Sequence, residues 1–206
     1  YTDSSVTSNS MIVVSDARSR VIDYNDVYTY SYDYSSYSRS IDGYDAEGQL
    51  TSAIQYVTME ASELPVIYQV TGHGETALSG NFTEAIEKAN ITLSDLTLLK
   101  EDAIPKDAAA LIINGPVNDF SEDDANKVID YINQGGKVLI TCNFQAEELA
   151  NFDKILSACG MSRVSGVVME NDKSYYYGDT PYYLLPIVES ASYTDSVANS
   201  YVFAPY

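Results

Sequence analysis

The side chains of this sequence that are best suited to chemistry follow short apolar runs. The segment Thr71-Gly72-His73-Gly74-Glu75 comes directly after one such run and contains the only histidine of the chain. An imidazole beside a carboxylate can transfer protons or hold a ligand. The two glycines predict a backbone that takes a conformation disfavoured for other residues and exposes the ring. His73 and Glu75 are therefore candidate ligand- or partner-binding residues, and the glycines are structural residues of the turn. Alternatively, the same segment forms a tight turn whose side chains satisfy only local backbone groups.

Polar side chains follow two later apolar runs in the same way. Asn114-Gly115-Pro116 and Asp119 follow one run, and Asn143 follows the next. If the runs are parallel strands, their carboxyl ends meet at one edge of a sheet, where ligands bind in open α/β folds. Asn114, Asp119 and Asn143 therefore join the candidate binding residues, whereas Gly115 and Pro116 are expected to shape the turn.

Cys142 occupies a position suited to a nucleophile. A class I glutamine amidotransferase carries its catalytic cysteine at such a strand end, on a Gly-x-Cys-x-Gly turn. Here Ile140 and Phe144 replace both glycines, and no histidine follows His73. The strands that bear His73 and Cys142 would lie two places apart, about 9.6 Å, which exceeds hydrogen-bond reach. We therefore assign no catalytic residue and expect Cys142 and Cys159 to be buried free thiols.

Composition excludes several classes of protein. The formal net charge is −19, with 30 acidic and 11 basic residues. Nucleic acids and anionic lipid surfaces both require basic patches, so neither is expected as a partner. One histidine and two separated cysteines do not supply a zinc site. The sequence has no glycine-rich nucleotide-binding motif, and we expect no metal and no cofactor.

From residue 49 onward, amphipathic helical patterns alternate with short apolar runs. Helices are expected over 49–61, after Asn81, after Ser121 and after Asn151, and strands over 66–70, 96–99, 109–113, 137–141 and 164–169. This alternation predicts an α/β fold, a three-layer doubly wound and mostly parallel sheet. About nine residues separate the second and third strands, too few for a helical crossover between neighbours. We therefore expect the flavodoxin-like strand order 2-1-3-4-5.

The N-terminal part has a different pattern. Residues 11–15 and 20–23 predict a β-hairpin. Tyr28, Tyr30, Tyr32 and Tyr34 alternate, which places four rings on one face of a strand, and 32–48 is expected to be a loop. We divide the chain into a β-rich extension at 1–48, an incomplete piece of a larger domain, and an α/β sandwich domain at 49–206 that ends in an irregular, tyrosine-rich segment.

Several segments, in this order and spacing, resemble the GldG-like auxiliary components of ABC transport systems, first known from gliding motility. The resemblance covers most of 11–190, and Gly72-His73-Gly74-Glu75 is its most specific element. The other matching segments are Gln49-Leu50-Thr51-Ser52-Ala53-Ile54, Ile104-Pro105-Lys106-Asp107 leading into 111–116, Gln134-Gly135-Gly136-Lys137-Val138-Leu139, and 152–160 with Val167-Val168. The sequence departs from the family at Thr141-Cys142-Asn143, where members tend to carry an acidic, Asp-Pro-like strand end.

This resemblance implies a fold related to the amidotransferase-like sandwich, without a known set of catalytic residues. It also implies an extracytoplasmic domain, anchored by membrane helices outside this chain, that works with the membrane and ATPase subunits of an ABC transporter. We therefore expect a non-enzymatic accessory or binding domain, with a small ligand or a cell-wall glycan as a further partner class. Two alternatives remain: an amidotransferase-like or hydrolytic enzyme that uses Cys142, and a carbohydrate- or cell-wall-binding module that uses the tyrosine face.

Overall fold

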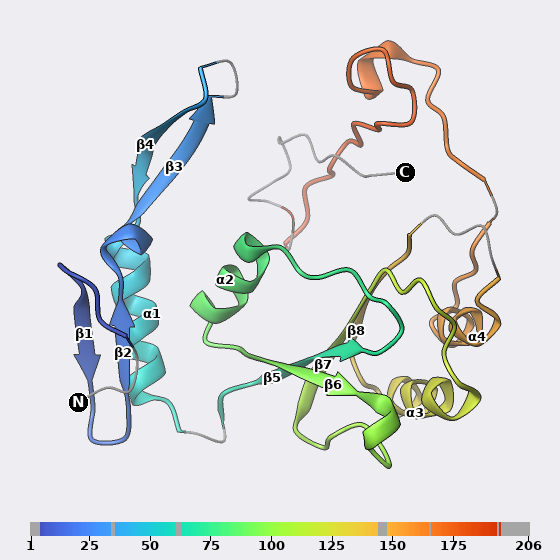
Figure 1. The fold of residues 1–206 in the computed structure, drawn as a ribbon, viewed down its shortest axis with the longest axis horizontal. Coiled ribbons are helices and arrows are strands. Elements are labelled where there is room, and N and C mark those ends of the chain that lie inside the picture. Colours follow the sequence, from blue (N-terminus) through green and yellow to red (C-terminus); the bar gives the residue numbers. More distant parts are fainter. Residues whose placement is uncertain are drawn as a thin grey trace.

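The protein has an α/β fold built around a four-stranded parallel sheet (Figure 1). The computed structural model describes residues 5–33, 36–60, 63–143, 148–164, 166–192 and 194. The strands of the sheet are β5 (Val66–Thr71), β6 (Thr92–Thr97), β7 (Ala108–Asn114) and β8 (Val138–Thr141). Their order is β6-β5-β7-β8, which confirms the expected order for the first four strands. Because β6 and β7 both flank β5, a short connection between them suffices.

The prediction of a fifth strand at 164–169 is wrong. Residues 164 and 166–169 belong to no strand. Val164 is 88% exposed and Val168 is 70% exposed. Gly166 has a φ of 136°, which interrupts the extended backbone that a strand requires. Among the described strands, β8 therefore forms one edge of the sheet.

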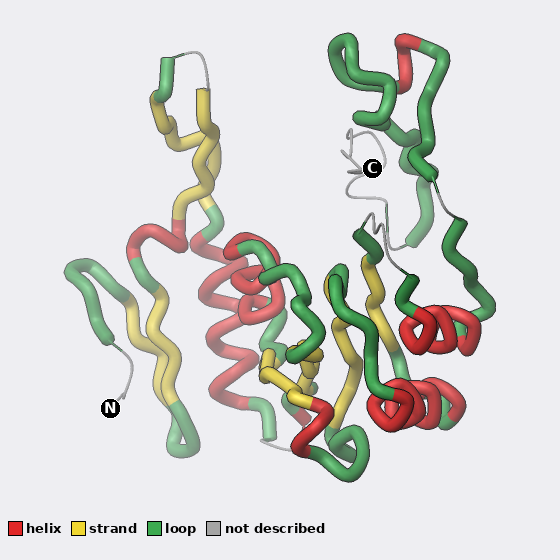
Figure 2. Tube along the Cα trace, turned by 45° about the vertical axis from the view of Figure 1, so that its right-hand side comes forward, coloured by secondary structure: helices red, strands yellow, loops and turns green. Residues whose placement is uncertain are grey.

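Helices flank the sheet on both sides (Figure 2). The helices α3 (Glu122–Asn133) and α4 (Ala150–Ala158) lie side by side against one face. The main apolar core lies between them and the sheet and includes Val70, Leu111, Val128 and Phe152, all nearly inaccessible to solvent. On the other side, α2 (Gly80–Lys88) packs near β6.

Several element boundaries differ from the expected ones. The first helix, α1, spans Ala46–Thr58 instead of 49–61. Helix α2 is capped by Ser79, whose hydroxyl accepts the Phe82 N–H, rather than by Asn81. The second strand of the sheet ends at Thr97, and the next residues form a short 3-10 helix, Leu98–Lys100. The cap of α3 is confirmed, because the Ser121 hydroxyl accepts the Asp124 N–H at 3.0 Å.

The N-terminal part contains two antiparallel hairpins. The expected first hairpin is confirmed as β1 (Met11–Val14) with β2 (Ser19–Ile22). A 3-10 helix, η1 (Tyr24–Val27), leads into β3 (Tyr28–Asp33), which pairs with β4 (Ser38–Tyr44). The loop expected at 32–48 is therefore wrong over most of its length. Ser38, Ser40 and Asp42 lie in β4, and Gly43 is needed where a Cβ would lie 2.3 Å from the Thr29 hydroxyl. Of the expected tyrosine face, Tyr34 and the side chain of Tyr32 lie outside what is described.

Helix α1 packs against the first hairpin, around a small cluster of Ile22, Val27 and Ala53 that shares no residue with the main core. Polar contacts join this part to the end of α2, and we call them the polar seam. Arg20 donates to the Asn90 side chain, the Asn90 amide donates to the Ser52 carbonyl at 2.9 Å, and Lys88 pairs with Asp45. The division of the chain between residues 48 and 49 stays a prediction. Helix α1 begins at Ala46, before that division, and contacts the hairpin.

The C-terminal segment is largely irregular, as expected. Its described regular parts are a 3-10 helix at Lys173–Tyr175 and a single antiparallel bridge between Tyr176 and Leu184. None of the described helices has the length and apolar composition needed to cross a bilayer.

Candidate functional site

The turn after β5 depends on its two glycines. Gly72 has a φ of 120° and Gly74 a φ of 72°, so both take the conformation expected of them. A Cβ on Gly74 would lie 2.5 Å from a methyl group of Val117, so only glycine lets the two loops approach. The His73 carbonyl then accepts the backbone N–H groups of Val117 and Asn118, at 3.0 and 2.9 Å. The loops after β5 and β7 are therefore held together through their backbones.

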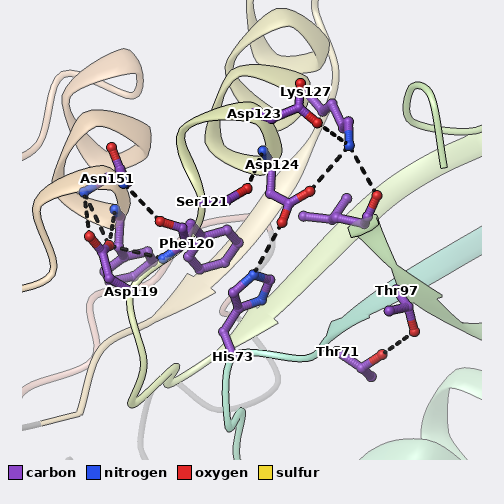
Figure 3. A network of polar contacts seen from close by, with 12 residues as sticks. Thr71, His73, Thr97, Asp119, Phe120, Ser121, Asp123, Asp124, Lys127 and Asn151 are labelled. Carbon is purple, nitrogen blue, oxygen red and sulfur yellow. Dashed lines mark hydrogen bonds and ion pairs between the residues drawn. The ribbon is translucent and has the colours of Figure 1, made fainter. Parts of the chain in front are cut away.

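The His73 ring is enclosed, which corrects the expectation that the glycines expose it. Only 8% of the residue is accessible to solvent. The ring stacks on Phe120, with centroids 3.7 Å apart and planes 7° apart. Its Nδ1 lies 2.9 Å from Glu75 Oε1, and the His73 backbone N–H donates to Glu75 Oε2 at 2.8 Å. On the other side, Nε2 lies 3.8 Å from Asp124 Oδ2 (Figure 3).

Alternating charges continue from this ring along the start of α3. Lys127 Nζ lies 3.2 Å from Asp124 Oδ1 and 2.6 Å from Asp123 Oδ2, and it donates to the Leu98 carbonyl at 3.1 Å. The Asp123 hydrogen bond raises the pKa of Lys127; burial opposes that rise and Asp124 adds to it. Both ion pairs lie within α3, whereas the hydrogen bond to the Leu98 carbonyl links α3 to the residues that follow β6.

Burial alone would raise the pKa of Glu75, because it disfavours the charged carboxylate. The hydrogen bonds from His73 and from backbone N–H groups outweigh this effect, so the pKa of Glu75 is lowered from its ordinary value. The carboxylate is thus held in its charged form beneath a nearly closed surface, with 4% of the side chain accessible.

Asn114 and Asn143 form a second group of polar residues at the ends of β7 and β8. The Thr141 hydroxyl donates to Asn114 Oδ1 at 2.7 Å, and Asn114 Nδ2 donates to the Thr76 carbonyl at 2.7 Å. Asn143 Nδ2 donates to the Gly115 carbonyl at 3.0 Å and contacts the Thr76 hydroxyl at 3.2 Å. Both amides therefore bond to neighbouring strands and to the loop that holds Glu75.

Gly115 and Pro116 lie where the sequence analysis expected turn residues. Both are buried, and Gly115 has a φ of 58°. A Cβ at Gly115 would lie 2.5 Å from the Asn143 amide nitrogen. A side chain at this position would displace the Asn143 amide, which links the end of β8 to the loops that follow β5 and β7.

Asp119 lies apart from both groups and caps a helix. Its carboxylate accepts the backbone N–H groups of Asn151 and Phe152, at 3.1 and 3.0 Å, and that of Phe120 at 3.0 Å. Asn151 Nδ2 returns a hydrogen bond to the Phe120 carbonyl at 2.8 Å (Figure 3). Asn151 was expected to cap α4, but the cap comes from this distant aspartate because the residue before the helix, Leu149, has no side-chain acceptor.

The structure thus brings His73 and Glu75 together, and Asn114 and Asn143 together, whereas Asp119 faces α4. Sequence reasoning missed Phe120 and Asp124, which enclose the His73 ring. One signal was present. Asp124 stands four residues before Val128 on the apolar stripe of its helix, and an acid on such a stripe requires a buried partner.

The Cys142 thiol is not activated. The residue is exposed, and Cys159 is partly exposed, so the expected burial of the two cysteines is wrong. The local surroundings still desolvate the thiol, and this raises the pKa of Cys142; Arg163 opposes the shift and Asp153 adds to it. A reactive cysteine needs a lowered pKa.

Within the described ranges, no three His, Cys, Asp or Glu side chains gather where they could hold a metal ion. Every buried side-chain nitrogen or oxygen in that part of the chain has a hydrogen-bond partner. A hollow of about 460 Å³ lies between α1 and α2 beside Thr51, Gln55 and Lys88, and another of about 360 Å³ lies in the C-terminal segment beside Val168 and Ile187. Neither is lined by a predicted site residue.

No family model matches this sequence, and no match to it was found among the curated proteins or the solved structures. The resemblance to GldG-like components therefore rests on the segments quoted above and stays a prediction.

Proposed function

We propose that this chain is a non-enzymatic, extracytoplasmic binding domain that acts as an accessory part of an ABC-type transport system. Its α/β unit is a rigid scaffold, and the partners are the membrane and ATPase subunits of the same system. The loops at the carboxyl ends of the sheet strands form one contact surface.

One observation carries the non-enzymatic part of the proposal. The polar side chains at the strand ends bond to one another and to the backbone: His73 to Glu75, and Asn143 to the Gly115 carbonyl. A catalytic group needs a free position facing its substrate. These side chains instead fix the shape of the loops, and loops of fixed shape suit binding by a partner protein.

The two alternatives receive less support. An enzyme that uses Cys142 would need a stabilised thiolate, and the raised pKa of this thiol opposes one. A sugar-binding module that stacks a sugar on Tyr30 would need that ring to be open, and the Arg39 guanidinium lies over it, 3.4 Å from its centroid.

The test is co-purification of the full-length protein, in mild detergent, with the permease and ATPase subunits encoded beside it. We expect all three to elute together, and we expect Cys142→Ala to leave that assembly unchanged. Failure to assemble, together with a turnover activity that Cys142→Ala abolishes in a folded protein, would refute the proposal.

A further inference from the structure

Residues 24–33 and 36–44 form a projecting element that we call the tyrosine finger, made of η1, β3, β4 and the described part of their turn (Figure 1, blue). Six of the 19 tyrosines of the chain lie in these residues. Two strands alone are marginally stable in water, and extra packing normally supports them. The finger nevertheless exposes large side chains: Tyr37 is 90% exposed, Tyr44 70% and Ile41 57%.

The two faces of the finger differ in chemistry. On one face, the Thr29 hydroxyl donates to Asp42 at 2.8 Å and the Ser31 and Ser40 hydroxyls lie 3.0 Å apart, so these polar groups bond to each other. The register places Tyr28 opposite Tyr44, and Tyr30 opposite Ile41, on the other face.

The rings of this aromatic face support one another. The Tyr28 and Tyr44 rings are 5.6 Å apart in an edge-to-face arrangement, and Tyr24 lies 5.1 Å from Tyr28. Tyrosines held in this way add contact area on binding at a small entropic cost, which is why they dominate binding loops. The face is therefore preorganised for contact.

The turn at the tip supplies a second observation. Tyr37 has a φ of 51°, a left-handed conformation that costs a residue other than glycine or asparagine about 1–2 kcal/mol. Hydrogen bonds from Ser36 to Asp33 support this turn, but the Tyr37 side chain is almost fully exposed and its own packing within the described chain does not offset that cost. Strain that is retained at an exposed aromatic side chain points to a role in contact with another molecule.

Charge selects the kind of partner. The finger has three aspartates, Asp26, Asp33 and Asp42, against the single Arg39, and the whole chain carries −19. The Arg39 guanidinium lies over the Tyr30 ring, so one ring of this face already binds a cation. Complementary charge favours a basic partner and repels acidic ones.

We propose that the tyrosine finger is a docking surface for a protein that presents arginine or lysine side chains among apolar ones, with Tyr37 and Tyr44 as its anchors. The inference goes beyond the proposed function. A transporter subunit would be one such protein, but the chemistry of the finger does not require one.

The test is photo-cross-linking in cells of the source organism, with p-benzoylphenylalanine in place of Tyr44. The matched control carries it in place of Tyr177, a tyrosine 60% exposed in the C-terminal segment. We expect a cross-link from position 44, and not from 177, to one protein whose cross-linked peptide contains lysine or arginine. Adding Tyr37→Asn should lower the yield about tenfold, the loss typical of an interface anchor. Salt at about 0.5 M should lower it too, because charge attraction is screened.

Asparagine tolerates the left-handed conformation, so Tyr37→Asn should unfold at the same temperature as the wild type or higher. Cross-links from position 44 only to another copy of this chain, only to glycan, or to no molecule would overturn the inference, as would a yield that Tyr37→Asn leaves unchanged. A basic partner outside any transport system would leave the inference standing and refute the proposed function. Transport subunits that co-purify with the protein, with no cross-link from position 44, would overturn the inference and leave the proposed function standing.

Discussion

Asp119→Ala tests the helix cap that sequence reasoning assigned to the wrong residue. The Asp119 carboxylate receives backbone N–H groups from Asn151, Phe152 and Phe120 at 3.0–3.1 Å. Loss of a side-chain cap costs about 1–2 kcal/mol. Loss of a negative charge at a helix N-terminus costs about 0.5–1 kcal/mol more. We therefore expect Asp119→Ala to lower the free energy of unfolding by about 1.5–3 kcal/mol.

Urea unfolding at pH 7 measures this difference directly. Asp119→Asn keeps an acceptor oxygen but loses the charge, so we expect it to cost about 1 kcal/mol. Glu122→Ala is the matched control, because that carboxylate is 77% exposed and lies in the first turn of α3, so the variant loses only a charge near a helix N-terminus; we expect a loss of no more than about 1 kcal/mol.

Hydrogen exchange locates the effect. In Asp119→Ala, the amides of Asn151 and Phe152 should lose protection more than those at the end of α4, because only the first turn loses its acceptor. A change in unfolding free energy below about 0.5 kcal/mol, or unchanged protection at these two amides, would refute the assignment of Asp119 as the cap.

Three further predictions concern the strand ends. Glu75→Gln should destabilise the protein by about 1–3 kcal/mol at neutral pH, because a buried charged hydrogen bond to His73 is lost. Since the fold lowers the pKa of Glu75 from 4.5, its stabilising effect is present above that pH and is lost as the pH falls through the lowered pKa, so the urea curves of wild type and variant should converge in acid. Cys142→Ala should change the unfolding free energy by less than about 0.5 kcal/mol. The rate of maleimide labelling of the wild-type thiol should still be rising with pH at 9.0, its ordinary pKa, because the thiolate fraction levels off only above the raised pKa; a rate that levels off below pH 9.0 would contradict this. Gly115→Ala should cost about 2 kcal/mol or more in thermal or urea unfolding, because φ is 58° and the new Cβ would meet the Asn143 amide; a stable variant would show that the amide moves away freely.

Much of the sheet could be predicted from the sequence, because continuous apolar runs such as Ala108–Asn114 leave few alternatives to buried parallel strands. The strand order followed from one short connection. The segment at 164–169 is also mostly apolar, yet it forms no strand in its described residues, because Gly166 has a φ of 136° and interrupts the extended backbone. Strand β4 was missed for the opposite reason, since serine, aspartate and glycine are typical of loops and only pairing with β3 makes them a strand.

The candidate site was predicted in part. The glycines beside His73 predicted an unusual backbone conformation, and the structure has one. The prediction that this backbone exposes the His73 ring was wrong. Phe120 covers the ring, and it comes from a segment that the sequence does not place there. The capping role of Asp119 was not predicted for the same reason, because the partner of this carboxylate becomes visible only when α4 packs beside it. Contacts between segments distant in the chain thus decided both cases.

The polar seam between the hairpin–α1 part and α2 has a mechanical consequence. A load applied to the tyrosine finger passes through α1 and reaches α2 across hydrogen bonds such as that from the Asn90 amide to the Ser52 carbonyl. Each such bond contributes about 1 kcal/mol net, and water replaces it when it opens. The main core, by contrast, resists because separating it would expose Val70, Leu111 and Phe152. Under tension the contacts of the polar seam should therefore break first, so that α1 moves away from α2 while the sheet keeps its shape.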